Sequence, residues 1–160
     1  MNIAIVTGAS SGMGREFVLR LSQYVDVDEI WAIARRKEAL EALNEAVSVP
    51  VRAIGLDLLE EDSFKTLSQL LQKESPNVKL LVNAAGFGKF GTYHKVPLED
   101  DCKMIDLNCK ALLVMTRLVL TYMEKAAISS SWTAYPPASL CPTSPPTVLP
   151  RPSFSATAGP

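Results

Sequence analysis

The chain has 160 residues, of which 48% are hydrophobic and 21% charged, and its formal net charge is −1. This length and apolar content predict one folded domain with a packed core and exclude a globally disordered chain. The near balance of basic and acidic residues gives no reason to expect nucleic acid or an anionic membrane as a partner.

Cysteine and histidine are too scarce for a disulfide framework or a metal site built on imidazoles. The three cysteines, Cys102, Cys109 and Cys141, form no CxxC pair, and His94 is the only histidine. We therefore expect no metal site and a reducing compartment. The opening apolar run is too short for a secretory signal, and no apolar stretch is long enough to span a bilayer. These features together favour a cytoplasmic location.

Apolar runs alternate with helical patterns along the first 125 residues. Apolar side chains recurring every three or four positions predict the helices, the longest of them over 99–125. Short, β-branched apolar runs predict strands at 2–7, 30–34, 51–56 and 78–82. Such alternation favours an α/β fold with a doubly wound parallel sheet, a three-layer αβα sandwich of the Rossmann type with strand order 3-2-1-4.

The composition changes abruptly after Lys125. Eight of the 11 prolines lie in residues 126–160, a stretch with Arg151 as its only charged residue. Repeated proline excludes a helix or an inner strand. We therefore expect a folded domain over 1–125 and a Pro/Ser/Thr-rich tail over 126–160 that is disordered or encoded by a shifted reading frame. The fold would then be incomplete on its C-terminal side, with the fourth strand as a bare edge.

A glycine-rich turn follows the first expected strand directly. Glycines between a strand and a helix permit a tight turn and let a pyrophosphate approach the backbone amides at the helix N-terminus. We therefore predict a dinucleotide site, and the alternative is a purely structural glycine turn. The candidate cofactor-binding residues here are Thr7, Gly8, Ser10, Ser11, Gly12, Met13 and Gly14.

The spacing TGxxxGxG and three later landmarks resemble the short-chain dehydrogenase/reductase family. The segment Asn83-Ala84-Ala85-Gly86 is similar to the Asn-Asn-Ala-Gly of the family, with Ala84 at the second Asn. Asp57-Leu58 resembles the adenine-contacting acid of the family, and Asn108 corresponds to its active-site Asn. The resemblance covers about residues 1–125. It implies that a hydride passes between a nicotinamide cofactor and a small carbonyl or alcohol substrate.

Basic residues after the second strand favour NADP(H) over NAD(H). An acidic residue at this place would bind the ribose 2′-hydroxyl of NAD, whereas this chain has Arg35 and Arg36. A guanidinium can hold the 2′-phosphate of NADP with two parallel hydrogen bonds. The alternative is a solvated basic turn.

The resemblance also implies a catalytic Tyr with a Lys four residues later, and no Tyr of this chain has one. The Lys matters because a phenol with a pKa of about 10 is a poor base at neutral pH without a nearby cation. Three functions stay open: a short-chain oxidoreductase, a non-catalytic dinucleotide-binding fragment, and a partner-binding module that uses the Pro-rich tail. The resemblance implies pairing through the long helix, so the apolar breadth of 99–125 predicts a homo-oligomer, and the alternative is a simple core face.

Overall fold

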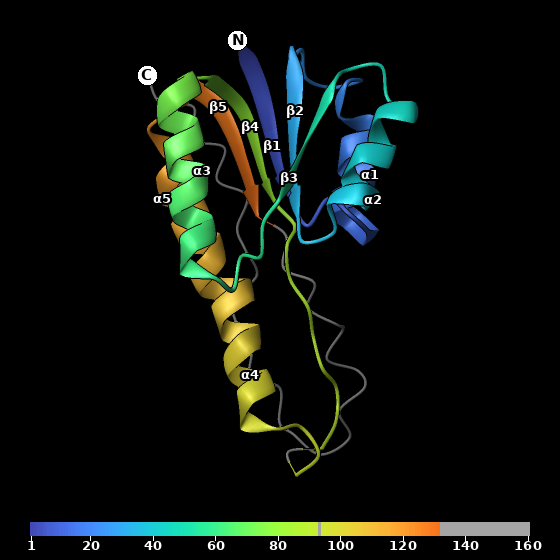
Figure 1. Cartoon of the computed structure of the whole chain (residues 1–160), viewed down its shortest axis with the longest axis vertical. Helices are drawn as coiled ribbons and strands as arrows, with labels where there is room; N and C mark the ends of the chain where they lie inside the picture. Colours follow the sequence, from blue (N-terminus) through green and yellow to red (C-terminus); the bar gives the residue numbers. More distant parts are fainter. Residues whose placement is uncertain (93, 132–160) are drawn as a thin grey trace.

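The computed structural model describes residues 1–92 and 94–131, and for 124–131 only the backbone is considered. A parallel sheet of five strands in the order β3-β2-β1-β4-β5 forms its centre (Figure 1). The strands are β1 (Asn2–Thr7), β2 (Glu29–Ala34), β3 (Val51–Gly55), β4 (Asn77–Asn83) and β5 (Met123–Ser131). Because the chain winds outward from β1 in both directions, the strand order reverses between β1 and β4, where parallel sheets leave a crevice.

Helices cover both faces of this sheet (Figure 1). One face carries α1 (Gly12–Leu21) and α2 (Lys37–Glu41), which continues as a 3-10 turn over Ala42–Glu45. The other face carries α3 (Glu61–Glu74) and α5 (Leu112–Leu120). The result is the predicted three-layer αβα arrangement.

Alternating side chains of β1 divide the core into two clusters. Ile3 and Ile5 belong to the cluster under α3 and α5, whereas Ala4 and Val6 belong to the cluster under α1 and α2. All four are fully buried, as expected for a central strand covered on both faces.

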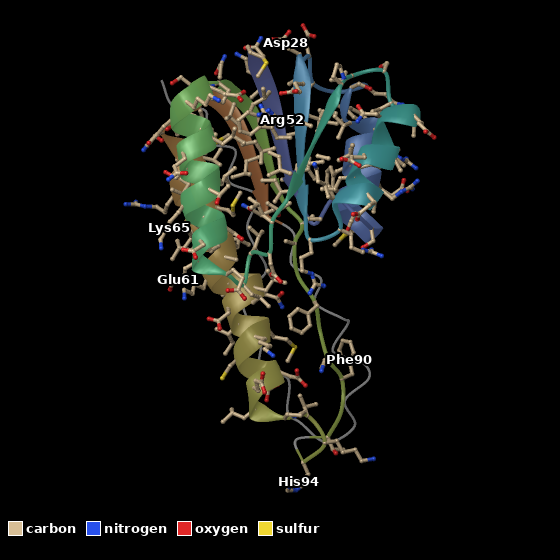
Figure 2. The ribbon with its side chains drawn as sticks, viewed as in Figure 1. Asp28, Arg52, Glu61, Lys65, Phe90 and His94 are labelled. Carbon is tan, nitrogen blue, oxygen red and sulfur yellow. The ribbon has the colours of Figure 1, made fainter. Side chains whose placement is uncertain are left out.

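The helical segment that follows the glycine-rich loop projects beyond the carboxyl ends of the strands (Figure 1). It comprises α4 (Leu98–Ile105), a π-helical segment η2 (Asp106–Ala111) and α5, and no residue of α4 is buried. The loop before α4 extends in the same direction and carries Phe90 and His94 far from the sheet (Figure 2).

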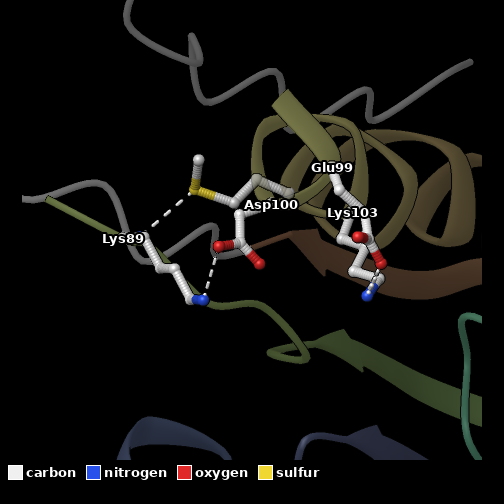
Figure 3. Close-up of polar contacts among 5 residues, drawn as sticks. Lys89, Glu99, Asp100 and Lys103 are labelled. Carbon is white, nitrogen blue, oxygen red and sulfur yellow. Dashed lines mark hydrogen bonds and ion pairs between the residues drawn. The ribbon is translucent and has the colours of Figure 1, made fainter. Parts of the chain in front are cut away.

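Polar contacts tie this loop to α4 (Figure 3). Lys89 Nζ donates to Asp100 Oδ2 at 2.6 Å, and the Lys89 backbone N–H donates to Met104 Sδ at 3.2 Å. On the same helix Lys103 donates to Glu99, and this hydrogen bond raises the pKa of the Lys103 ammonium. The loop is therefore held against the projecting helix.

The structure corrects two sequence predictions. The fourth strand is not a bare edge, because β5 pairs with β4 in parallel from Val78–Met123 to Asn83–Ser131. The expected helix 99–125 ends at Leu120 and contains the π-helical segment, so its last residues turn into β5 instead. Residues 126–131 of the expected tail thus belong to a strand, and 132–160 lie outside the described residues.

Candidate functional site

A cavity of about 320 Å³ opens at the carboxyl ends of the strands, across the reversal of strand order. It is lined by the β1–α1 turn and by the residues that follow β2, β3 and β4. Twelve predicted cofactor-binding residues lie in its wall: Gly8, Ser10, Ser11, Gly12, Met13, Arg35, Arg36, Asp57, Leu58, Ala84, Ala85 and Gly86. The topology therefore gathers four separate stretches of sequence at one site.

Two glycines pack the β1–α1 turn tightly against its neighbours. At Gly8 the φ angle is 67°, and an added Cβ would lie 2.6 Å from the carbonyl oxygen of Ala84. At Gly14 an added Cβ would lie 2.7 Å from the carbonyl carbon of Gly8. No side chain fits at either position, because backbone atoms already occupy the space.

Gly12 serves a different purpose from these two glycines. Its φ angle is 55°, so the position favours glycine, yet an added Cβ would meet nothing within 4 Å. The open space lies where the turn enters α1 and forms part of the cavity wall. A ligand could therefore approach the backbone closely here.

The N-terminus of α1 presents backbone N–H donors beside this space. Its N-cap residue Ser11 has an extended backbone and makes no side-chain cap hydrogen bond, and the first turn contains no acidic residue. The first N–H groups of a helix lack intrahelical partners, and the helix dipole places positive potential there. The arrangement fits a pyrophosphate, which supplies acceptor oxygens and negative charge.

Thr7 lies beneath the cavity wall and not in it. Its side chain is buried, and its hydroxyl oxygen accepts hydrogen bonds from the backbone N–H groups of Ala84 and Ala85, both at 3.1 Å. The hydroxyl in turn points its own donor toward the carbonyl of Val82 at 3.5 Å. Thr7 therefore fixes the chain after β4 against the end of β1.

Asn83 connects β4 to α5 and does not reach the cavity wall. Its Nδ2 donates to Thr116 Oγ1 at 3.1 Å, and Thr116 donates to the carbonyl of Leu112. Asn83 is 2% exposed, and its Oδ1 has no hydrogen-bond partner in the described part of the chain.

Asn108, on the π-helical segment, fixes the loop that follows β4. Its Oδ1 accepts from the backbone N–H of Phe87 at 3.0 Å, and its Nδ2 donates to the carbonyl of Phe87 at 2.9 Å. A Cβ added at Gly86 would lie 2.9 Å from Asn108 Oδ1, so a side chain there would have to displace the Asn108 amide. Asn108 thus acts on the cavity through Phe87, which lines it.

Charged side chains lie at the edge of the cavity beyond β2 and β3. Arg35 and Arg36 are exposed, and neither forms an ion pair with another described residue. Asp57 is half-buried, and its Oδ1 accepts from the backbone N–H of Leu59 at 3.0 Å. Two guanidinium groups are therefore available to an anion here.

Six further residues line the cavity that the motifs did not single out for cofactor binding. All six are apolar: Ile33, Ala34, Leu56, Leu59, Phe87 and Leu107. Ile33 and Ala34 end β2, and Leu56, Leu59 and Phe87 follow directly on β3 or on motif residues, so their place beside these elements is the signal that could have identified them. Leu107 is the exception, because it lies on η2. Only the direction of the projecting helical segment brings it to the cavity.

Residues 1–92 and 94–131 contain neither a cluster of metal ligands nor a membrane-spanning helix. No group of three or more His, Cys, Asp or Glu residues there could hold a metal ion. None of the helices in this part is long and apolar enough to cross a membrane.

Curated proteins are similar to this chain in sequence. YdfG of Escherichia coli strain K12, described as an NADP-dependent 3-hydroxy acid dehydrogenase, is 34% identical over 122 residues, which are 76% of this chain and 48% of YdfG. VdlC of Helicobacter pylori, a probable short-chain type dehydrogenase/reductase, is 28% identical over 79% of this chain and 45% of its own length. The chain thus spans about half the length of the curated relatives it matches.

Two solved structures are similar to this chain in both fold and sequence. The crystal structure of serine dehydrogenase from Escherichia coli superposes with a TM-score of 0.64 at 32% identity, covering 76% of this chain and 55% of that one. A closed form of serine dehydrogenase complexed with NADP+ gives a TM-score of 0.62 at 34% identity, covering 74% and 48%.

The family profile described as short chain dehydrogenase matches residues 2–130, which include all five strands except the last residue of β5. The glycine turn, the strand order and the segment after β4 agree with that match. This chain therefore belongs to the short-chain dehydrogenase family of oxidoreductases.

Proposed function

We propose that this chain binds NADP(H) in the cavity at the carboxyl ends of its strands. The observation that carries the proposal is the N-terminus of α1, which has no side-chain cap, beside the open space at Gly12. Two arginines at the edge of the same cavity form no ion pair with another described residue. YdfG is named as NADP-dependent, and one of the similar structures is a complex with NADP+. Both names support NADP(H) over NAD(H).

Each part of the cavity fits one part of NADP(H). The α1 amides and the Ser10 and Ser11 hydroxyls would hold the pyrophosphate. Arg35 and Arg36 would hold the ribose 2′-phosphate. Asp57 and Leu58 would contact the adenine, and the segment Asn83 to Gly86 would support the nicotinamide end.

We also propose the reaction that the protein carries out: reversible hydride transfer to a small carbonyl compound or from an alcohol. The bound nicotinamide supplies the hydride or accepts it. Within this chain Asn108 holds the backbone of Phe87 at the cavity and thereby keeps the loop after β4 in place. Such placement lowers the cost of ordering the site when substrate binds.

A second candidate function is cofactor binding without turnover, favoured by one observation. None of the tyrosines in the chain has a lysine four residues later, so the pair that would move the proton in the family is missing. We expect the 160-residue chain to bind NADPH and to oxidise it slowly or not at all.

Two measurements on the purified chain test these proposals. Enhancement of NADPH fluorescence on titration with protein reports binding, with NADH titrated in parallel. NADPH oxidation with a panel of ketones, aldehydes and keto acids reports turnover. Binding without oxidation supports the second candidate, oxidation supports the enzyme, and a flat fluorescence titration rejects NADP(H) binding.

We further propose that the chain acts in the cytoplasm and forms a homo-oligomer through the helical segment 98–120. Cys102 and Cys109, the cysteines within the described residues, form no disulfide there, and the reducing environment that this indicates supports the location. Exposed apolar side chains on that segment support the oligomer. Light scattering after gel filtration, and fluorescence microscopy of the tagged chain, test the two statements separately.

A further inference from the structure

Of the large apolar side chains that the structure places in the cavity wall, only that of Met13 is exposed. It lies at the start of α1 and is 43% exposed, whereas Ile33 and Leu58 in the same wall are exposed by 0% and 6%. The residues on either side of it, Gly12 and Gly14, have no side chains that would cover it. The Met13 side chain is therefore accessible to small solutes that enter the cavity.

The other four methionines differ from Met13 in exposure or in place. Met1 is 57% exposed, but it precedes β1 and so lies at the end of the sheet opposite to the cavity. Met104 and Met123 are half-buried, and Met104 Sδ accepts a hydrogen bond from a backbone N–H. Met115 is fully buried. Met13 alone among the methionines is both exposed and part of the cavity wall.

Oxidation converts a methionine from an apolar side chain into a polar one. The thioether sulfur attacks one oxygen of a peroxide, so that an S–O bond forms and the O–O bond breaks. The sulfur loses two electrons, which the peroxide gains. With hydrogen peroxide the second oxygen leaves as hydroxide and takes the proton of the first, which yields water. The resulting sulfoxide oxygen carries partial negative charge and accepts hydrogen bonds.

A sulfoxide at Met13 would interfere with an anion at the N-terminus of α1. Side chains in an α-helix lean toward its N-terminus, so that of Met13 lies beside the first N–H groups of the helix. The positive potential there attracts a phosphate, and it attracts the sulfoxide oxygen in the same way. The oxidised side chain therefore competes with the phosphate for these donors and repels it electrostatically.

We propose that Met13 is an oxidation site of this chain, with a peroxide as the oxidant, and that its sulfoxide weakens the binding of NADP(H). The inference rests on the cofactor binding proposed above and adds a modification that controls it. A bound cofactor in turn covers the cavity wall and shields the thioether. Peroxide therefore modifies Met13 chiefly while the cavity is empty.

Peptide mapping by mass spectrometry gives the first test. The 160-residue chain is treated with hydrogen peroxide, and the fraction of each methionine that has gained one oxygen atom is followed over time. We expect Met13 to react about as fast as the exposed Met1 and roughly tenfold or more faster than the buried Met115. Saturating NADP+ should slow Met13 several-fold and leave Met1 unchanged. A Met13 that reacts as slowly as Met115 would overturn the proposal.

NADPH fluorescence titrations before and after oxidation give the second test, with the peroxide removed first. The dissociation constant should rise about tenfold, which corresponds to the loss of one charge-assisted hydrogen bond. Methionine sulfoxide reductases for both sulfoxide epimers should restore the original constant. Dithiothreitol alone, which reverses the oxidation of cysteine to a sulfenic acid or a disulfide, should not restore it.

Two leucine variants separate Met13 from the other oxidisable residues. Each variant is compared with itself before and after peroxide, and circular dichroism checks that it is folded. In Met13→Leu the dissociation constant for NADPH should be the same before and after treatment. In the matched control Met104→Leu, which lies outside the cavity wall, it should rise as in the unmodified chain. An equal loss of affinity in both variants would assign the effect to another residue.

The outcomes distinguish this inference from the proposed cofactor binding. A flat NADPH titration of the unoxidised chain rejects the cofactor, and the inference fails with it. Binding that persists unchanged when peptide mapping shows Met13 oxidised rejects the inference alone. The same holds if NADPH binds but saturating NADP+ does not slow the oxidation of Met13.

Discussion

The side chain of Asn108 forms two hydrogen bonds with the backbone of Phe87, at 3.0 and 2.9 Å. One amide group thus satisfies both the N–H and the carbonyl of a residue 21 positions earlier in the chain. The contact joins the π-helical segment to the loop that borders the cavity. It links the shape of the site to the projecting helical segment.

Replacing Asn108 by Ala should loosen this loop. The variant loses both hydrogen bonds and leaves two half-buried backbone groups without these partners, which should cost about 1–2 kcal/mol of unfolding free energy. Urea unfolding measures the cost, and amide hydrogen exchange at Phe87 should accelerate. Cys109→Ala, on the exposed side of the same segment, is the control and should leave that exchange rate unchanged. A Phe87 amide equally protected in both variants would contradict the role given to Asn108.

Gly8 and Gly12 should respond differently to alanine. Gly8→Ala places a methyl group 2.6 Å from a backbone oxygen at a positive φ, so it should destabilise the fold by about 2–4 kcal/mol. Gly12→Ala meets open space and should cost only about 1–2 kcal/mol for its positive φ. Its methyl group nevertheless enters the cavity beside the α1 amides and should weaken NADPH binding strongly. Urea unfolding and NADPH fluorescence, measured on both variants, test the division between a packing glycine and a binding glycine.

Arg35→Asp should change cofactor preference. Loss of a charge-assisted hydrogen bond costs about 1.5–3 kcal/mol, so the ratio of NADPH to NADH dissociation constants should rise by roughly tenfold or more. Lys37→Asp is a close control, because Lys37 pairs with Glu41 at 3.5 Å and does not line the cavity. If both variants alter the ratio equally, general surface charge and not Arg35 sets the preference.

Substitutions of Thr7 test the hydrogen bonds that support the cavity wall. Thr7→Val keeps the shape but removes the acceptor of the Ala84 and Ala85 amides, which should cost about 2–3 kcal/mol of unfolding free energy. Thr7→Ser keeps the hydroxyl and should cost about 1 kcal/mol for the lost methyl group. Thermal or urea unfolding of the two variants gives the comparison. Equal losses would mean that packing, not hydrogen bonding, explains the buried Thr7.

Local patterns predicted the first four strands because each is a short apolar run next to a turn. The glycine turn was equally visible, since the order strand, glycines and helix occurs within the first 21 residues. β5 was missed because its last six residues, Ala126–Ser131, are small or polar apart from Ile128, and only pairing with β4 makes it a strand. A non-local partner of this kind leaves no periodic signal in the strand itself.

The contacts that support the site could not be predicted from the sequence either. The i, i+3 and i, i+4 spacing that identified a long helix does not distinguish an α-helix from one with a π-helical segment, so η2 was not foreseen. Asn108 was identified by resemblance, but its partner Phe87 depends on the path of a loop. Thr7 and Asn83 belong to motifs, yet the structure places both in the support behind the wall.

Gly14 contacts Gly8, and Gly8 contacts Ala84. These contacts join the start of α1, the glycine turn and the chain just after β4 without any side chain between them. These three parts can therefore shift only as a unit. A nucleotide-binding loop transplanted from another protein would be tolerated here only together with its own helix start and the chain segment that follows its fourth strand. Engineering of cofactor preference in this chain should accordingly exchange the arginines after β2, whose side chains are free to vary, and leave the glycine turn untouched.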